Sequence, residues 1–282
     1  MKISIRCAVW CLLAGLSGGC RLPAPPAGPG APAAEQEPER LLVAHYFNWF
    51  HTPAGRGGWH MWEWTGNGPN HDPERAGPDG RRDIASVFHP RIGPYDSSRP
   101  EVMEYHLLLA KLSGLDGFVV DWYGLAHHDD RLMEPLLDQA AKLGLRVGIC
   151  FEDKAMFGYA YQARTREEAV RNAISNLTYV LTRYAPHPAY LRLEGRPLVV
   201  NFSWSEPQAD VSAQGFSAAE WQRILAAVRV RHALQFLHDF HGHVRESYWE
   251  VADNVYPWLD VNGASLERFY REAQERIASG RI

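Results

Sequence analysis

Apolar and polar positions change period along residues 41–279, which predicts strands and helices that follow one another in turn. Short, nearly continuous apolar runs are typical of strands covered on both faces. They predict six strands, at 41–50, 116–123, 145–153, 197–204, 234–240 and 254–258. Amphipathic segments predict helices at 100–113, 132–143, 165–184, 218–231, 244–251 and 265–279. This alternation predicts an α/β fold with a parallel sheet.

The carboxyl ends of the predicted strands gather polar and aromatic residues, whereas the strand starts are aliphatic. In a (β/α)8 barrel of the TIM type, the carboxyl ends of the strands form the mouth of the active site. Residues 41–282 contain neither a glycine-rich phosphate loop after the first strand nor a G-x-S-x-G motif. A dinucleotide-binding sheet and an α/β-hydrolase are therefore disfavoured.

The predicted strands are two short of the eight that such a barrel needs. The last predicted helix reaches residue 279, and the sequence stops where a seventh strand would begin. We therefore expect an incomplete barrel over residues 41–282, with strands seven and eight missing. The alternative is an open six-stranded α/β sheet that is complete as written.

The pattern of residues 1–40 predicts a targeting segment followed by a tether. Residues 1–19 combine Lys2 and Arg6 with a short apolar run and then small residues, which is typical of a secretory signal. Gly18-Gly19-Cys20 is similar to a bacterial lipobox, so we expect Cys20 to be lipidated. Residues 20–40 are rich in Pro, Ala and Gly and predict an extended tether. The expected location is a bacterial membrane, periplasmic or at the cell surface, through the lipid anchor only; plain secretion is the alternative.

Charge and composition narrow the class of partner. The 282 residues carry a formal charge of −4 at pH 7 and contain no basic block, which disfavours a nucleic-acid partner. Aromatic residues reach 12%, including 10 Trp, and flat aromatic faces suit stacking on sugar rings. Of the four cysteines only Cys150 lies in the predicted barrel, so no disulfide is expected there.

Several blocks of the chain resemble the endo-α-mannosidase family, glycoside hydrolase family 99, and its α-glucanase relatives of family 71. The resemblance covers about residues 41–264 and is strongest before 125. The matching blocks are 44–49 (AHYFNW), 71–73 (HDP), 84–97 (IASVFHPRIGPYDS), 100–106 (PEVMEYH), 117–124 (GFVVDWYG), 151–153 (FED), 255–256 (VY) and 262–263 (NG).

The resemblance implies endo-acting cleavage of α-linked mannosides or glucosides of a glycan or polysaccharide, with retention of configuration. A carboxylate would assist attack by the substrate's own 2-hydroxyl, and neither a metal nor an organic cofactor is implied. One departure concerns the acidic catalytic pair, which the family carries in an Asn-Glu-Trp-His-Glu segment near strand eight. The sequence contains no such segment, so the fold can carry over without the activity.

Carboxylates at the strand ends are the candidates for glycosidic chemistry, which needs a proton donor and a second carboxylate. Consecutive strand residues point to opposite faces, so only one of Glu152 and Asp153 can face the mouth. The resemblance favours Glu152, with Asp121 beside it, as the catalytic candidates. The alternatives are an ion pair between Glu152 and Lys154 and a loop-capping role for Asp121. Asp153 and Asp239 remain candidates for substrate binding.

Aromatic and polar residues at the same strand ends are candidate sugar contacts. The predicted stacking walls and hydrogen-bonding groups are Tyr46, Trp49, Trp122, Tyr123, Asn201, Trp204, His238, Tyr256 and Trp258. The long loop of residues 50–95 is rich in Gly, Trp and His, and long loops of this kind build binding sites. The resemblance adds its Trp59, His60, Trp62, Glu63, His71 and Asp72, unless the loop is held by its own aromatic cluster.

Two other functions stay open. A metal-dependent hydrolase would use the His-rich stretches 127–130 and 238–243, but the first strand lacks the His-x-His pair of amidohydrolase barrels. A non-catalytic, glycan-binding lipoprotein would fit aromatic walls that lack a complete acid pair.

Overall fold

The computed structural model describes residues 41–64, 70–203, 215–240, 246–257 and 264–280. The predicted signal segment, the tether and Cys20 lie outside these residues. Among the described helices, none combines the length and the apolar character that crossing a lipid bilayer would require.

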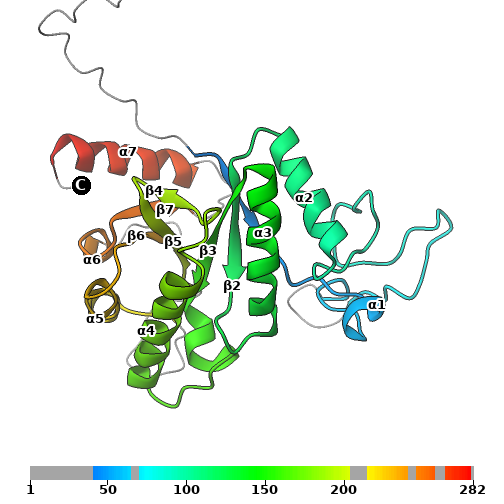
Figure 1. Cartoon of the computed structure of the whole chain (residues 1–282), viewed down its shortest axis with the longest axis horizontal. Helices are drawn as coiled ribbons and strands as arrows, with labels where there is room; N and C mark the ends of the chain where they lie inside the picture. The colour runs from blue at the N-terminus through cyan, green and yellow to red at the C-terminus, as the bar shows by residue number, and fades with distance from the viewer. Residues whose placement is uncertain (1–40, 65–69, 204–214, 241–245, 258–263, 281–282) are drawn as a thin grey trace, which may run out of the picture. The chain divides into compact units, whose positions relative to one another are not determined.

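Six parallel strands form the main sheet, and each pairs with the next in the chain (Figure 1). Their order across the sheet is β1 (Val43–Tyr46), β2 (Gly117–Trp122), β3 (Arg146–Glu152), β5 (Arg196–Phe202), β6 (Gln235–Phe240) and β7 (Asn254–Pro257). All six predicted strands are confirmed, with ends that differ by a few residues.

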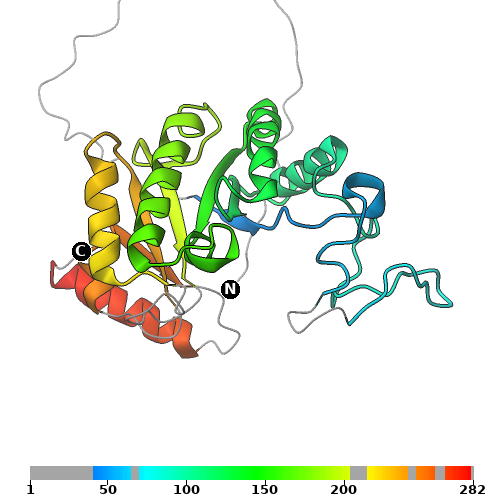
Figure 2. The ribbon, with the colours of Figure 1, turned by 90° about the horizontal axis from the view of Figure 1, so that it is seen from below.

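A helix connects each pair of neighbouring strands, and the six predicted helices are also confirmed. They are α2 (Pro100–Leu112), α3 (Met133–Leu143), α4 (Arg166–Arg183), α5 (Ala218–Arg229), α6 (Glu246–Trp249) and α7 (Ala264–Ala278). Figure 2 shows α2, α3, α4 and α5 side by side along one face of the sheet. This is the (β/α) arrangement of a TIM-type barrel, here with six βα units.

Local sequence explains where the long helices begin and end. Thr165 and Ser217 cap α4 and α5, each in a reciprocal capping box with the Glu three residues later. Helix α3 ends at Gly144, whose left-handed backbone suits glycine. Helix α5 buries Trp221, Ile224, Leu225 and Val228, the stripe that a helical period of 3.6 predicts.

The two faces of the sheet carry separate apolar clusters. Phe118, Val120 and Trp122 of β2 belong to the large cluster under the helices. Val119 of the same strand belongs to a second cluster with Cys150 and Val200. We call this second side the inner face. Because side chains alternate along a strand, every second residue of β1 to β7 points to it.

The sheet curls so strongly that its two edge strands approach each other across the inner face. The rings of His45 on β1 and Tyr256 on β7 stack with their centroids 5.9 Å apart. Main-chain pairing between β1 and β7 does not occur in the described part of the chain. The sheet is therefore an incomplete barrel, and the prediction of this fold is confirmed.

Four short elements escaped the sequence analysis. They are α1 (Pro53–Arg56), the two-residue strand β4 (Arg192–Leu193), which pairs antiparallel with β5, the 3₁₀ helix η1 (His128–Leu132) and the π-helical turn η2 (Ala155–Tyr159). These elements have two to five residues and lack the apolar runs or flanking signals that revealed the other short elements.

Gly117 provides a test of the β2–β3 packing. A Cβ atom at this position would lie 1.8 Å from the main-chain oxygen of Arg146, so the two strands would have to separate. We expect Gly117→Ala to lower the free energy of unfolding by at least about 2 kcal/mol in urea denaturation. Gly58→Ala is the control, since a Cβ there meets no atom within 4 Å. Equal stability of the two variants would contradict this packing.

Candidate active site

Two carboxylates lie next to each other at the carboxyl ends of β2 and β3. Asp121 is paired in register with Cys150, and Glu152 lies two residues further along β3 on the same inner face. Both residues are buried, with exposed fractions of 4% for Asp121 and 3% for Glu152. Their two carboxyl groups are hydrogen-bonded to each other.

Burial and proximity leave this pair with too little stabilisation for two negative charges. Burial raises the pKa of Asp121, although hydrogen bonds from Glu152 and Tyr123 oppose this effect. Burial raises the pKa of Glu152 further, and the neighbouring negative charge of Asp121 adds to the effect. The hydrogen bond therefore has Glu152 as the donor and Asp121 as the acceptor. A pair of this kind shares one proton at neutral pH.

Lys154 and Tyr123 border the pair. The Lys154 Nζ lies 3.8 Å from Glu152 Oε2 and 5.3 Å from the centroid of the Tyr123 ring. The contact between Glu152 and Lys154, given above as an alternative role for Glu152, is therefore present, but the raised pKa of Glu152 weakens it as an ion pair. Trp49 continues this border, with its ring centroid 5.9 Å from that of Tyr123. One cation and two aromatic rings thus stand beside the acidic pair.

Each acid of the pair keeps one oxygen that the protein does not satisfy. Within the described residues, Asp121 Oδ1 and Glu152 Oε2 are buried and accept no hydrogen bond. Buried polar atoms in folded proteins nearly always have a partner, so exceptions call for an explanation. Two such oxygens on adjacent carboxyl groups can receive hydroxyl donors from a ligand.

Tyr256 and His45 occupy the interior beside the carboxylates. The Tyr256 hydroxyl donates to the main-chain oxygen of Asn201 at 2.9 Å and lies 3.9 Å from Cys150 Sγ. Burial raises the pKa of Tyr256 and lowers that of His45, so both groups are neutral at pH 7. The Tyr256 hydroxyl thus has a protein partner, and its predicted contact with a sugar stays a prediction.

Asp153 is the first residue after β3, where the chain turns helical, and its side chain points away from the inner face. Its carboxylate accepts hydrogen bonds from Asn201 Nδ2 at 2.6 Å, Ser203 Oγ at 3.1 Å and the Phe216 amide at 3.0 Å. Burial raises the pKa of Asp153 to about 8 in spite of these donors. This geometry favours a structural role for Asp153 and Asn201, which join β3 and β5 to the segment before α5.

Three more predicted contacts lie on the helix-facing side of the sheet. Tyr46 stacks on Phe118 and its hydroxyl contacts His106, and Trp122 donates to Asp130 at 2.9 Å. His238 packs on Tyr248, with a centroid distance of 4.3 Å. The sheet separates these side chains from Asp121 and Glu152, so this geometry favours structural roles.

Asp239 alternates with His238 along β6 and therefore points to the inner face. Its Oδ1 accepts a hydrogen bond from the amide of Ser203 at 3.0 Å. It joins Asp121, Glu152 and Tyr256 as predicted residues that share this face. Trp204 and Trp258 lie outside the described residues, as do His241, His243, Asn262 and Gly263.

The first loop is held largely by its own aromatic cluster. Trp62 is buried against Phe50 and Tyr95 and donates to the Tyr95 carbonyl at 2.9 Å. Trp59 donates to Glu74 at 2.6 Å, and His71 contacts Asp83 at 2.6 Å. His60 pairs through its main chain with His51. Glu63 and Asp72 are the other two loop candidates. Their contact with substrate stays a prediction.

Sequence reasoning gave no site role to two residues that border the site: it treats Lys154 only as an ion-pair partner and His45 only as a strand end. His45 lies two residues from Val43 on the inner face of β1, which is the signal that identifies it. Lys154 follows the end of β3 in helical backbone and carries no such signal. His51 and Asp129 form a further cluster with His128, which contains ligand types suited to a metal. The 77-residue separation of His51 and His128 gives no local signal for that contact.

Comparisons with known proteins agree with this architecture. The sequence model of glycosyl hydrolase family 99 matches residues 38–229. The chain belongs to glycosyl hydrolase family 99. The match includes β1 to β5 and both members of the Asp121–Glu152 pair, and the resemblance seen in the sequence is thereby confirmed.

The relatives of the chain include vertebrate proteins. It is 29% identical over 171 residues to the mouse glycoprotein endo-alpha-1,2-mannosidase and 28% identical over 163 residues to the human glycoprotein endo-alpha-1,2-mannosidase-like protein. These matches cover 55% and 54% of this chain but 34% and 33% of the relatives. The chain therefore spans about a third of the length of the curated relatives it matches.

A solved structure supports the fold. The GH99 endo-alpha-mannosidase from Bacteroides thetaiotaomicron superposes with a TM-score of 0.64 at 22% sequence identity. The superposition covers 85% of this chain and 68% of that one. At this identity the likeness establishes the shared barrel architecture.

The raised pKa values of the pair predict a pH-dependent stability. The folded chain holds a proton that the unfolded chain loses above about pH 4, so burial of the pair costs more stability as the pH rises. We expect Glu152→Gln, which cannot ionise, to gain stability relative to the unchanged protein as the pH rises from 5 to 8. Urea denaturation at several pH values measures this difference.

The exposed Glu104 supplies the control for this measurement. Glu104→Gln should track the unchanged protein at every pH. If Glu152→Gln lost stability relative to that control as the pH rose, the shared proton would be refuted.

Proposed function

We propose that this chain serves endo-acting cleavage of α-linked mannosides or glucosides in a glycan, with α-1,2-linked mannosides as the first substrate to test. Membership of family 99 supports this class of reaction. The choice of sugar follows the names of relatives, which include a glycoprotein endo-alpha-1,2-mannosidase. The Asp121–Glu152 pair is the part of the site that this chain supplies.

The observation that carries this proposal is the pair of unsatisfied carboxylate oxygens on the inner face. Sugar hydroxyls are donors, so one sugar unit can satisfy Asp121 Oδ1 and Glu152 Oε2 together. Bonds to a charged acceptor are the stronger kind and would fix the orientation of the sugar. Lys154 and Tyr123 border the same position, and the partly exposed Trp49 offers a ring for stacking.

The raised pKa of Glu152 gives the pair an acid as well as a base. A carboxyl group that stays protonated at neutral pH can donate to an oxygen of the substrate, while Asp121 accepts from a hydroxyl. Cleavage with retention through the 2-hydroxyl of the substrate needs a carboxylate that takes up the hydroxyl proton. We assign that acceptor role to Asp121 and the donor role to Glu152.

Glycan binding without cleavage is the second candidate, and the geometry of the pair favours it. Retaining glycosidases that form a glycosyl-enzyme place their two carboxyl groups about 5–5.5 Å apart, on either side of the bond. The carboxyl groups of Asp121 and Glu152 are instead hydrogen-bonded to each other, so they approach a sugar from one side. The pair then acts as a clamp on a hydroxyl.

Binding and cleavage of α-1,2-mannobiose and of an α-1,2-mannan separate these functions. We expect calorimetric binding of the disaccharide, with affinity at least about 10-fold lower in Asp121→Asn and Glu152→Gln, because each loses a hydrogen bond to a charged or acidic group. Glu104→Gln is the control. New reducing ends from the mannan would support cleavage, and binding alone would support the second candidate.

Failure of the unchanged protein to bind or cleave any α-mannoside or α-glucoside would overturn both functions. Equal binding by Asp121→Asn and the control would remove the pair from the site even if the protein bound the sugar.

We also propose that the chain is exported and anchored through a lipid on Cys20. The charged start, short apolar run and Gly-Gly-Cys of residues 2–20 support this. Metabolic labelling in a bacterial host with a palmitate analogue should tag the protein, and Cys20→Ala should abolish the label. Labelling that persists in Cys20→Ala would contradict the anchor, and an unlabelled protein in the medium would favour plain secretion.

A further inference from the structure

A second cluster of ionisable side chains lies beyond the carboxylate pair, where the first loop meets the loop after β2. It consists of His51, which follows β1, together with His128 and Asp129 at the start of η1. One nitrogen or oxygen atom from each side chain lies within 4.8 Å of those of the other two. Residues 77 and 78 positions apart thus meet at one point.

Two imidazoles converge on a single carboxylate oxygen in this cluster. His51 Nε2 lies 3.1 Å and His128 Nε2 lies 3.2 Å from Asp129 Oδ1. His51 and Asp129 are buried, whereas the His128 side chain keeps an exposed fraction of 34%. The cluster is thus anchored inside the protein and open on one side, which leaves an ion a path of entry.

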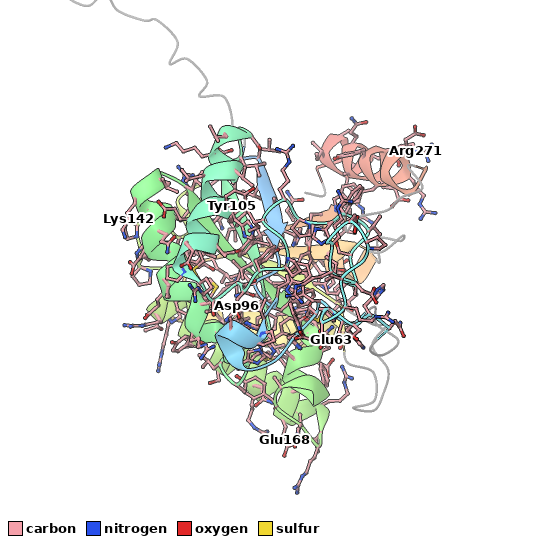
Figure 3. The ribbon with its side chains drawn as sticks, turned by 90° about the vertical axis from the view of Figure 1, so that its right-hand side faces the viewer. Glu63, Asp96, Tyr105, Lys142, Glu168 and Arg271 are labelled. Atoms are coloured by element: carbon pink, nitrogen blue, oxygen red, sulfur yellow. The ribbon has the colours of Figure 1, made fainter. Side chains whose placement is uncertain are left out.

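Asp96 supports His51 from the opposite side of its ring. Asp96 Oδ1 lies 3.3 Å from His51 Nδ1, and the Asp96 carboxylate also accepts from the amides of Thr52 and Ser98. Gly55 of α1 packs so closely that a Cβ there would lie 1.8 Å from Asp96 Oδ2. Figure 3 labels Asp96 beside this helix.

Both ring nitrogens of His51 face carboxylates, Nδ1 toward Asp96 and Nε2 toward Asp129. An ion bound at Nε2 would leave the Nδ1 proton to donate to Asp96. Histidines that bind metals characteristically donate their other ring nitrogen to a carboxylate in this way.

We propose that His51, His128 and Asp129 bind one Zn²⁺ ion. Two imidazoles and a carboxylate are ligands that Zn²⁺ prefers, with a fourth position left for water or a further side chain. The His60 ring lies 5.9 Å from that of His51 and 6.0 Å from that of His128, which makes His60 a candidate for that position.

The ion would have a structural role at the rim of the candidate active site. His51 and His60 form a main-chain bridge inside the first loop, whereas His128 and Asp129 belong to the segment after β2. A shared ion would therefore join the first loop to the barrel. The neighbouring His127 packs on Tyr123, with a centroid distance of 5.0 Å, and Tyr123 borders the carboxylate pair. This inference does not depend on the proposed glycosidase function.

Metal binding by the full chain tests the proposal. The protein is freed of metal with a chelator and titrated with Zn²⁺ by calorimetry, and with Co²⁺ by visible absorption. We expect one Zn²⁺ per chain, a d–d absorption band from bound Co²⁺, and a Tm that rises by roughly 5–10 °C at a Zn²⁺ concentration of about 100 Kd. Absence of a stoichiometric site for either ion would overturn the proposal.

Variants locate the ion. We expect His128→Ala and Asp129→Asn to weaken Zn²⁺ binding at least 10-fold and to abolish the Co²⁺ band. His187→Ala is the matched control, since His187 Nε2 forms a similar 3.2 Å contact with Asp138 elsewhere on the surface. His128 is partly exposed, so its replacement should leave the fold intact, which circular dichroism checks. A Zn²⁺ affinity unchanged in folded His128→Ala would place the ion at another site and refute this one.

Discussion

Neighbouring residues of a β-strand point to opposite faces of the sheet, and the candidate site depends on this alternation along β3, which ends with Glu152 on the inner face just before Asp153. Glu152 faces Asp121 across the interior, whereas Asp153 is tied to Asn201, Ser203 and the Phe216 amide under the helices. A shift of one residue in the register of β3 would exchange the two acids. The paired hydrogen bonds of β2, β3 and β5 hold this register and thus hold the chemistry.

Keeping two acids inside a protein costs stability, and the surrounding structure offsets that cost in different ways. Asp153 receives three hydrogen bonds from groups that are fixed in the fold. The Asp121–Glu152 pair has Lys154 beside it, and one oxygen on each acid accepts no hydrogen bond from the residues that the structure describes. The pair is therefore less well satisfied than Asp153, although it is almost as deeply buried. Such a difference is typical of sites that trade stability for ligand contact.

Much of the fold could be predicted from the sequence, because each strand and each long helix carries its own period. The opposite orientations of Glu152 and Asp153 followed from the same rule. The rule was not extended to Trp122, Asn201 and His238, whose polar or aromatic character suggested the mouth although they alternate with inner-face neighbours. The contact of His51 with Asp129 could not be predicted, since it depends on how a 46-residue loop folds back.

The Tyr256 side chain lies in the interior of the incomplete barrel, beneath the level of Asp121 and Glu152. Its hydroxyl reaches the layer of Cys150, which precedes Glu152 by two residues on β3, and its ring meets His45 on the opposite edge strand. Side chains thus fill the interior one layer beneath the acids, so the carboxyl ends of the strands are the side from which a ligand can reach them.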